Sequence, residues 1–365
     1  LCLRGRVYIF IEVILMNTKT VCKVLNVSSK ALRIYEDMGI IVPKRDKNNY
    51  RNYSENDLLK LRQLILLKEM GIPLRKINSI LQKDFDEENK MVKILDIQLK
   101  VVENKINELK NIKNTLELGI NDILNKNVID YNTYFDKVDR CLKENIEKRN
   151  IWLDKWDFDS WAKNYDVYVQ KNLDDELNLF ERYDFVLESV AELVLQNNPL
   201  NVIDIGCGTG NLYGKLNSNN IEFTGIDQSI EMLLYARRKY PYMNLRLGNF
   251  LDEPFIENKV DIITSTFAFH HLDYMEKQKA INLMLRYLKS GGIIIIADLM
   301  FLNNKEKVKQ KEVLIKRGRR DLWDIIEDEY YTDIEEIDKY SQGLGCMVNY
   351  KHIANFTWLL QIEKK

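Results

Sequence analysis

Cysteine and histidine are both scarce in this sequence, which contains five Cys and three His among 365 residues. The cysteines are odd in number and scattered along the chain, and no two of them form a C-x-x-C pair. Neither a disulfide framework nor a zinc site follows from such spacing. We therefore predict reduced thiols in a cytoplasmic protein, and no metal site.

Long hydrophobic runs are also missing. The apolar run at residues 7–15 is interrupted by Glu12 and is too short to span a bilayer. No small-residue cleavage site of the kind that ends a signal peptide follows it, and 30% of all residues are charged. The sequence thus predicts no membrane segment. Residues 1–15 are expected to be a leader outside the domains, with a leading strand as the alternative.

The two ends of the chain carry charge of opposite sign. Residues 16–82 carry an excess of Lys and Arg, whereas residues 151–365 carry an excess of Asp and Glu, although the net charge of the whole chain is only −1. A basic segment attracts polyanions, and an acidic segment avoids them. The two ends are therefore expected to have different partners.

A heptad pattern runs from Phe85 to Ile123. Apolar residues recur there at alternating steps of four and three, in a stretch without proline. The two ladders are Val92, Leu99, Ile106 and Ile120, and Leu95, Val102, Leu109, Leu116 and Ile123. Lys113 replaces one rung of the first ladder. The pattern is typical of a coiled-coil helix, so we predict a dimerisation helix within residues 83–127. An amphipathic helix packed on its own domain is the alternative.

Short helical stripes and a polar excursion follow one another in the basic segment. A first helix is expected around residues 21–25, and Ser28 can cap a second helix that ends at Gly39. Two short helices around a tight turn form a helix-turn-helix. Residues 43–53 are then polar and extended, with cations between tyrosines, which suits a wing that touches phosphates. Ser54 is expected to cap a third helix, and a fourth follows.

The ordered series KALRIYEDMGIIVP, NNYRNYS and LILLKEMGIPLRKI resembles the MerR family of winged-helix transcription regulators over residues 16–82. The resemblance implies double-stranded promoter DNA and RNA polymerase as partners, and a homodimer through residues 85–123. It implies DNA contacts from the second helix and the wing, made by Lys30, Arg33, Tyr35, Arg45, Tyr50, Arg51 and Tyr53. Asn49 stands where Gly is usual in the wing turn, which Asn tolerates because it also adopts left-handed geometry. Cys22 and Cys141 do not reproduce the arrangement of metal-sensing members, so no metal effector is predicted.

Residues 128–150 are a polar connector, and residues 151–365 alternate short apolar runs with helical stretches. Such alternation predicts an α/β domain with a mainly parallel sheet. The run N-V-I-D-I feeds directly into a glycine-dense turn, G-C-G-T-G at residues 206–210. Glycines there permit tight backbone geometry and the close approach of a ligand. Residue 211 is not the glycine that a dinucleotide fingerprint requires, and no P-loop motif is present, so both of those classes are disfavoured.

Further landmarks follow the glycine turn in order. Asp227 ends the next strand, Asn249 and Phe250 follow a third, and Thr266 ends a fourth. Together they resemble the class I S-adenosylmethionine-dependent methyltransferases that act on small molecules, which implies a Rossmann-like fold and S-adenosyl-L-methionine as cofactor. The glycines would pass its methionine part, Asp227 would bind its ribose, and a tyrosine near the start of the domain would close over it. The implied cofactor-binding set is Tyr165, Asp204, Gly206, Gly208, Gly210, Asp227, Asn249, Phe250 and Thr266.

The pair His270 and His271 directly follows the fourth strand. Either one could act as a general base near neutral pH. The alternative is that they only fix the loop, since methyl transfer from a sulfonium needs little beyond alignment of the reactants. A basic and then acidic block at residues 305–338 is expected to form a helix pair that covers the substrate, with Glu329, Tyr330 and Tyr331 lining it.

The sequence therefore predicts a multidomain, homodimeric regulator with a methyltransferase-like C-terminal half. Two functions stay open for that half: an enzyme that methylates a small molecule, or a sensor that binds S-adenosylmethionine or its product without turnover. A DNA or RNA methyltransferase with a targeting head is a third class. No D/N-P-P-Y/F motif follows the fourth strand, where Thr264 begins T-S-T-F, so the amino-methylating DNA enzymes are disfavoured.

Overall fold

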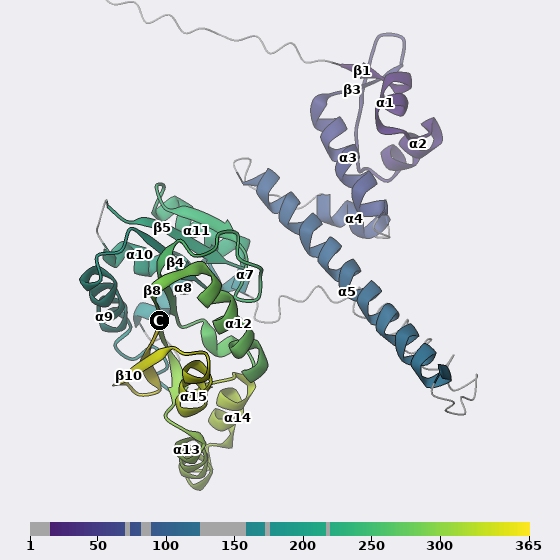
Figure 1. Ribbon diagram of the computed structural model, residues 1–365. Helices are drawn as coiled ribbons and strands as arrows, with labels where there is room; N and C mark the ends of the chain where they lie inside the picture. The colour runs from purple at the N-terminus through teal and green to yellow at the C-terminus, as the bar shows by residue number, and fades with distance from the viewer. Residues whose placement is uncertain (1–14, 70–73, 82–88, 125–157, 172–175, 217–219) are drawn as a thin grey trace, which may run out of the picture. The chain divides into compact units, whose positions relative to one another are not determined.

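The computed structural model of the chain describes residues 15–69, 74–81, 89–124, 158–171, 176–216 and 220–365. The chain divides into two compact units, Leu1–Trp152 and Leu153–Lys365 (Figure 1). Apart from Leu15, the expected leader lies outside the described residues, as does the expected connector. Among the described helices, none is long and apolar enough to cross a membrane.

The first unit opens with two short helices around a tight turn. Helix α1 (Thr18–Leu25) ends at Asn26, which has left-handed backbone geometry with a φ of 52°. Helix α2 (Ser29–Asp37) begins after Ser28, whose Oγ accepts a hydrogen bond from the backbone N–H of Ala31 at 3.1 Å. The predicted cap is therefore confirmed, and it satisfies one of the free donors at the start of the helix.

A small antiparallel sheet carries the predicted wing. Its order is β1-β3-β2, built from β1 (Met16–Asn17), β2 (Lys44–Arg45) and β3 (Arg51–Tyr53). Asn49 lies in the turn between β2 and β3 with a φ of 64°, so it adopts the left-handed geometry that was expected of it.

Helices α3 (Glu55–Glu69) and α4 (Leu74–Leu81) follow the wing. Ser54 and Asp57 cap α3 reciprocally, because each side chain accepts a hydrogen bond from the backbone N–H of the other residue. The core of this head is formed by side chains from α1 to α4, from β3 and from the segment after α2: Val21, Leu32, Tyr35, Ile40, Ile41, Tyr53, Leu58, Leu61, Leu64, Leu67 and Ile77.

The heptad segment forms a single helix, α5 (Lys90–Leu124), of 35 residues. At 1.5 Å per residue its length is about 50 Å. Six of its ladder side chains are exposed on the single chain: Leu95, Leu99, Ile106, Leu109, Leu116 and Ile120. Val92 and Val102 are half-buried. Lys113, at the interrupted rung, forms an ion pair with Glu117 at 3.1 Å. The helix is thus observed, whereas its pairing with a second copy stays a prediction.

The second unit is built on one large sheet. Its path has the order β10-β11-β8-β7-β4-β5-β6, and a short strand β9 pairs with β8. Only β10 and β11 run antiparallel to their neighbours. The strands are β4 (Asn201–Ile205), β5 (Glu222–Asp227), β6 (Asn244–Leu247), β7 (Val260–Thr266), β8 (Leu288–Phe301), β9 (Thr332–Asp333), β10 (Met347–Ala354) and β11 (Thr357–Glu363).

Helices flank this sheet (Figure 1). They are α7 (Phe158–Trp161), α8 (Tyr165–Lys171), α9 (Tyr183–Gln196), α10 (Asn211–Leu216), α11 (Ile230–Lys239), α12 (Tyr274–Tyr287), α13 (Asn304–Lys316), α14 (Arg320–Asp328) and α15 (Ile334–Gly343), with a 3-10 turn η1 (Phe269–His271). Helices α13 and α14 form the helix pair that the basic and acidic block predicted, and they lie between β8 and β9 in the chain.

The strand order determines where a ligand can bind. The chain runs from β4 outward through β5 to β6, and then returns to the other side of β4 to form β7 and β8. In open α/β sheets, such a reversal leaves a crevice at the carboxyl ends of the strands. The glycine turn follows β4 at this edge, and the histidine pair follows β7.

Candidate functional site

The loop after β4 requires glycine for two separate reasons. Gly206, Gly208 and Gly210 have φ values of 77°, 52° and 80°, in the left-handed region that glycine enters without strain. A Cβ atom at Gly206 would also lie 2.4 Å from the Cβ of Ala268. The backbone N–H groups of Gly206 and Cys207 both donate to the carbonyl of Ile226, at 2.8 and 3.0 Å. The loop is therefore held against the end of β5.

Asp227, the last residue of β5, accepts hydrogen bonds from two backbone N–H groups. Gly208 donates to its Oδ2 and Ser229 donates to its Oδ1, each at 2.8 Å. An ionised carboxylate can accept about four hydrogen bonds, so acceptor capacity is left for a ligand. Burial raises the pKa of Asp227 to about 6, against the lowering effect of the two N–H bonds. Asp227 therefore lies beside the glycine loop, whereas its contact with a ribose stays a prediction.

Asp204 lies behind the loop rather than in the crevice. It is fully buried, and its Oδ1 accepts a hydrogen bond from Thr264 Oγ1 at 2.8 Å. Burial, together with the charge of Asp227, raises its pKa to about 7, although the Thr264 bond lowers it. In the described part of the chain its Oδ2 has no hydrogen-bond partner. In the described residues neither of its carboxylate oxygens is hydrogen-bonded to the glycine loop, and its contact with the cofactor stays a prediction.

Helix α8 packs against the glycine loop. A Cβ at Gly208 would lie 3.8 Å from the Cε1 atom of Tyr165, the first residue of α8. The next residue, Asp166, accepts hydrogen bonds from Thr209 Oγ1 at 2.5 Å and from Asn211 Nδ2 at 3.0 Å, and it pairs with Lys239 at 2.9 Å. Tyr165 belongs to the predicted cofactor-binding set, whereas the adjacent Asp166 does not. The acidic residue directly after that tyrosine was the available signal.

The remaining residues of the predicted cofactor-binding set, Asn249, Phe250 and Thr266, are partly engaged in contacts within the protein. Asn249 Oδ1 accepts from the backbone N–H of Leu251 at 2.8 Å, so it closes a local turn. Phe250 is 8% exposed and packs edge-to-face on Phe269 with ring centroids 5.7 Å apart. Its ring comes within 3.8 Å of a Cβ built at Gly206 and thus supports the loop from the core side. Thr266 is half-buried at the end of β7.

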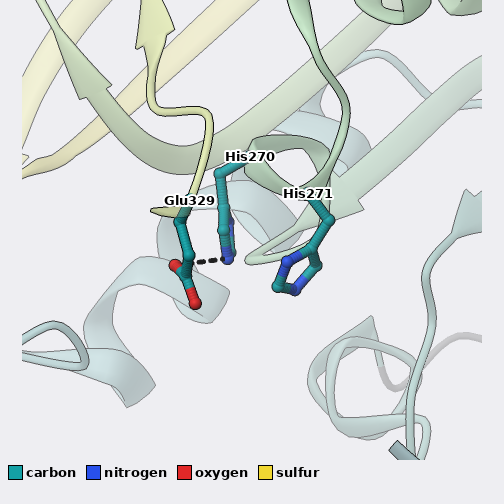
Figure 2. A group of neighbouring side chains, drawn as sticks. All are labelled: His270, His271 and Glu329. Atoms are coloured by element: carbon teal, nitrogen blue, oxygen red, sulfur yellow. Dashed lines mark ion pairs between the residues drawn. The ribbon is translucent and has the colours of Figure 1, made fainter. Parts of the chain in front are cut away.

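The histidine pair lies at the carboxyl end of β7, next to a buried carboxylate. His270 is 5% exposed, and its Nδ1 lies 2.5 Å from Asp298 Oδ1 in β8. On the other side of the ring, Nε2 lies 3.4 Å from Glu329 Oε2 (Figure 2). Burial lowers the pKa of His270, but the charge and hydrogen bond of Asp298 outweigh it, so the pKa is raised. His271 is more exposed and stacks beside His270 with ring centroids 4.0 Å apart.

Two of the tyrosines predicted to contact DNA belong to the core instead. Tyr35 is 2% exposed and Tyr53 is fully buried, and both pack in the apolar cluster of the head. The prediction that these two tyrosines contact DNA is wrong, because a ring buried in the core of the head cannot lie against a phosphate. Their apolar bodies fill the space between α2, β3 and α3, which periodicity alone does not distinguish from a surface position.

The remaining residues of the predicted DNA surface are exposed or half-exposed. Lys30 and Arg33 are exposed on α2, and Tyr50 is 70% exposed in the wing. Arg45 and Arg51 both pair with Glu36, at 2.7 and 2.5 Å. Burial raises the pKa of Glu36, but the hydrogen bonds and charges of the two arginines outweigh it and hold the pKa below its ordinary value. Glu36 therefore ties the wing to α2.

Fold and site together define a class: a winged helix-turn-helix head joined to an α/β domain of the methyltransferase type. The family described as "MerR HTH family regulatory protein" matches residues 16–84, and the family described as "Methyltransferase domain" matches residues 202–292. An uncharacterized methyltransferase of Oceanobacillus iheyensis is 31% identical over 207 residues, which are 57% of this chain and 95% of that protein. Another, of Bacillus cytotoxicus, is 34% identical over 209 residues, or 57% of this chain and 96% of that protein.

The chain belongs to this family of methyltransferases, and it carries a MerR-type, DNA-binding regulatory domain at residues 16–84. Among solved structures, the magnesium protoporphyrin IX methyltransferase of Synechocystis with bound SAH aligns with a TM-score of 0.45 at 15% identity. That alignment covers 58% of this chain and 100% of the other.

Proposed function

We propose that the C-terminal domain binds S-adenosyl-L-methionine and methylates a small molecule, and that this event acts on the DNA-binding head. The cofactor assignment rests on one observation: the glycine loop is held against Asp227 by a hydrogen bond of 2.8 Å from the Gly208 N–H to the Asp227 carboxylate. The loop has glycine, without a side chain, at three left-handed positions, 206, 208 and 210, so a ligand can approach its backbone closely.

Each part of the crevice has a separate task in this proposal. Asp227 accepts the two ribose hydroxyls with the acceptor capacity that its backbone partners leave. Gly206 and Gly208 border the methionine part, and the unpaired Oδ2 of Asp204 marks a polar position beneath them. Tyr165 covers the loop, and Asp166 fixes its helix there. When bound, the cofactor supplies an electrophilic methyl group; the chain aligns the acceptor with it and excludes water.

The head binds DNA, and we propose that it does so as a homodimer on a promoter. Lys30 and Arg33 on α2, and Tyr50 in the wing, are the exposed candidates for DNA contact. Arg45 and Arg51 can join them once their pairs with Glu36 open. The apolar ladders of α5 supply the dimer contact and so set the distance between the two heads. RNA polymerase is the further partner expected of a MerR-type regulator.

Calorimetry on the full chain with S-adenosylmethionine and with S-adenosylhomocysteine tests this proposal, followed by a search for methylated products in a pool of small metabolites. Binding of both ligands together with a methylated product supports the enzyme. Binding without any product supports the sensor that responds to cofactor or product. Absence of binding to either ligand contradicts the proposal in both forms.

A further inference from the structure

Two of the three histidines in the chain converge with a glutamate at the carboxyl end of β7. His270, His271 and Glu329 each present a donor atom, and these atoms all lie within 4.8 Å of one another (Figure 2). We propose that they bind one divalent transition-metal ion of the zinc class. The third histidine, His352, is exposed on β10 and bonds the carbonyl of Asn355 instead.

The distance between the two best-placed donors fits coordination by one ion. Zn²⁺ binds histidine nitrogen and carboxylate oxygen at about 2.0–2.1 Å, and two such donors on a tetrahedral ion stand about 3.4 Å apart. His270 Nε2 and Glu329 Oε2 lie 3.4 Å apart. Only His271 has to move closer, and its side chain is the more exposed of the two histidines.

The surroundings fix the orientation of His270. Asp298 is fully buried, and it accepts hydrogen bonds from the backbone N–H groups of His270 and Leu299, at 2.8 and 2.7 Å. Its Oδ1 faces His270 Nδ1 at 2.5 Å. A carboxylate in this position keeps the proton on Nδ1, so the lone pair on Nε2 points toward Glu329. In many metal sites a carboxylate bonds the second nitrogen of a ligating histidine in the same way, which orients the imidazole and raises its basicity.

The backbone beside Glu329 is also fixed. Lys277 is 3% exposed, and its Nζ donates to the carbonyl of Tyr330 at 2.5 Å. Immediately afterwards, β9 pairs with β8, with Thr332 opposite Met300. Glu329 itself ends α14 with extended backbone geometry. The carboxylate is therefore carried by a segment anchored on both the α12 side and the sheet side.

The donor set determines the class of ion. Two imidazole nitrogens and one carboxylate oxygen suit zinc and its first-row neighbours, whereas Mg²⁺ and Ca²⁺ prefer oxygen ligands throughout. Three protein ligands leave a fourth position open, which is the pattern of catalytic rather than structural zinc sites.

The position of the cluster suggests what the ion does. Its first member, His270, lies two residues after Ala268 in the chain, and Ala268 packs on Gly206 of the glycine loop. Resting on the proposed function, we assign the open position to the acceptor's O, N or S atom. An acceptor bound there gives its proton to solvent more readily, and the electron pair stays on the heteroatom, because the cation stabilises the resulting anion. The chain then needs no exposed general base.

Metal binding to the chelator-treated full chain provides the test. Zn²⁺ titration by calorimetry is expected to give one tight equivalent per chain, and Co²⁺ is expected to give the visible absorption of a tetrahedral site. Glu329→Gln and His271→Ala should each weaken Zn²⁺ binding by tenfold or more, since losing even an outer partner costs about 10- to 100-fold. His352→Ala and Glu312→Gln, which change an exposed histidine and an exposed glutamate elsewhere, should leave it unchanged.

Three results overturn the inference: no tight equivalent in the wild type, equal affinity in Glu329→Gln, or tighter binding of Mg²⁺ than of Zn²⁺. The competing interpretation, a protonated His270 that bridges Asp298 and Glu329 without metal, predicts the first of these. Calorimetry of S-adenosylmethionine with the metal-free chain separates this question from the proposed function. Cofactor binding without Zn²⁺ binding would contradict only the metal site. Zn²⁺ binding without cofactor binding would contradict only the cofactor assignment.

Discussion

Replacing Asp227 with alanine is the sharpest test of the cofactor site. The substitution removes the carboxylate that closes the glycine loop and that is proposed to accept the ribose hydroxyls. Hydrogen bonds to a charged group are worth about 1.5–3 kcal/mol each. Two of them at the lower end amount to about 3 kcal/mol, which corresponds to roughly 100-fold weaker binding of S-adenosylmethionine.

Stability has to be separated from affinity in this experiment, and two effects oppose each other. The substitution leaves the N–H groups of Gly208 and Ser229 without their acceptor, which costs about 1–3 kcal/mol. It also removes a carboxyl whose pKa rises from 3.8 to about 6 on folding, a penalty of about 3 kcal/mol for its ionised form at neutral pH. The free energy of unfolding is therefore expected to change by only about 1 kcal/mol.

Asp261→Ala is the matched control. Asp261 also accepts two backbone N–H bonds, from Leu200 and Asn201, but it stands at the opposite end of the sheet and pairs with Lys289. This variant should lose stability in urea unfolding and keep the wild-type affinity in calorimetry. If Asp227→Ala binds S-adenosylmethionine as tightly as the wild type, the cofactor site is elsewhere.

Four further predictions concern the effect of pH on stability and on cofactor affinity, the DNA surface, and the long helix. Burial raises the pKa of Asp227 to about 6 and that of Asp204 to about 7, so folding takes up protons between pH 3.8 and 7. The free energy of unfolding should therefore fall as the pH rises through this window. Asp204→Asn should make this fall less steep in urea unfolding measured at several pH values. S-adenosylmethionine affinity should instead decline below about pH 6, as Asp227 becomes protonated; a flat calorimetric profile would contradict this. Arg33→Ala should weaken promoter binding and reduce the salt slope by about 1 per head in fluorescence anisotropy, whereas the exposed Arg62 on α3, changed to Ala, should alter neither. Lys113→Leu should raise the thermal midpoint and tighten the dimer in sedimentation, and the coiled-coil assignment fails if both stay at wild-type values.

Local chemistry accounts for the elements that could be predicted. The Ser28 cap, the reciprocal Ser54–Asp57 cap and the left-handed Asn49 all depend on a few consecutive residues, so each could be recognised without a fold. The glycine turn after a β-branched run is a local signal of the same kind. The heptad period likewise predicted one long helix, and the structure has it in α5.

Burial and long-range convergence could not be predicted in the same way. Tyr35 and Tyr53 carry the same side chain as Tyr50, and only packing against α3 makes the first two core residues and leaves the third exposed. Asp166 accepts a hydrogen bond from the glycine loop because the fold packs α8 against that loop, although the two are far apart in the sequence.

By itself, the sequence determined the order of the elements, the two families to which the halves belong, and the residue types at the cofactor turn. Those properties are encoded by local propensity and by the spacing of glycines and carboxylates. Only the tertiary structure decided that Glu329 meets His270, that Asp298 orients its ring, and that Asp204 is sealed behind the loop. Such contacts depend on how strands pair and how the chain crosses the sheet, and no local pattern in the sequence specifies that geometry.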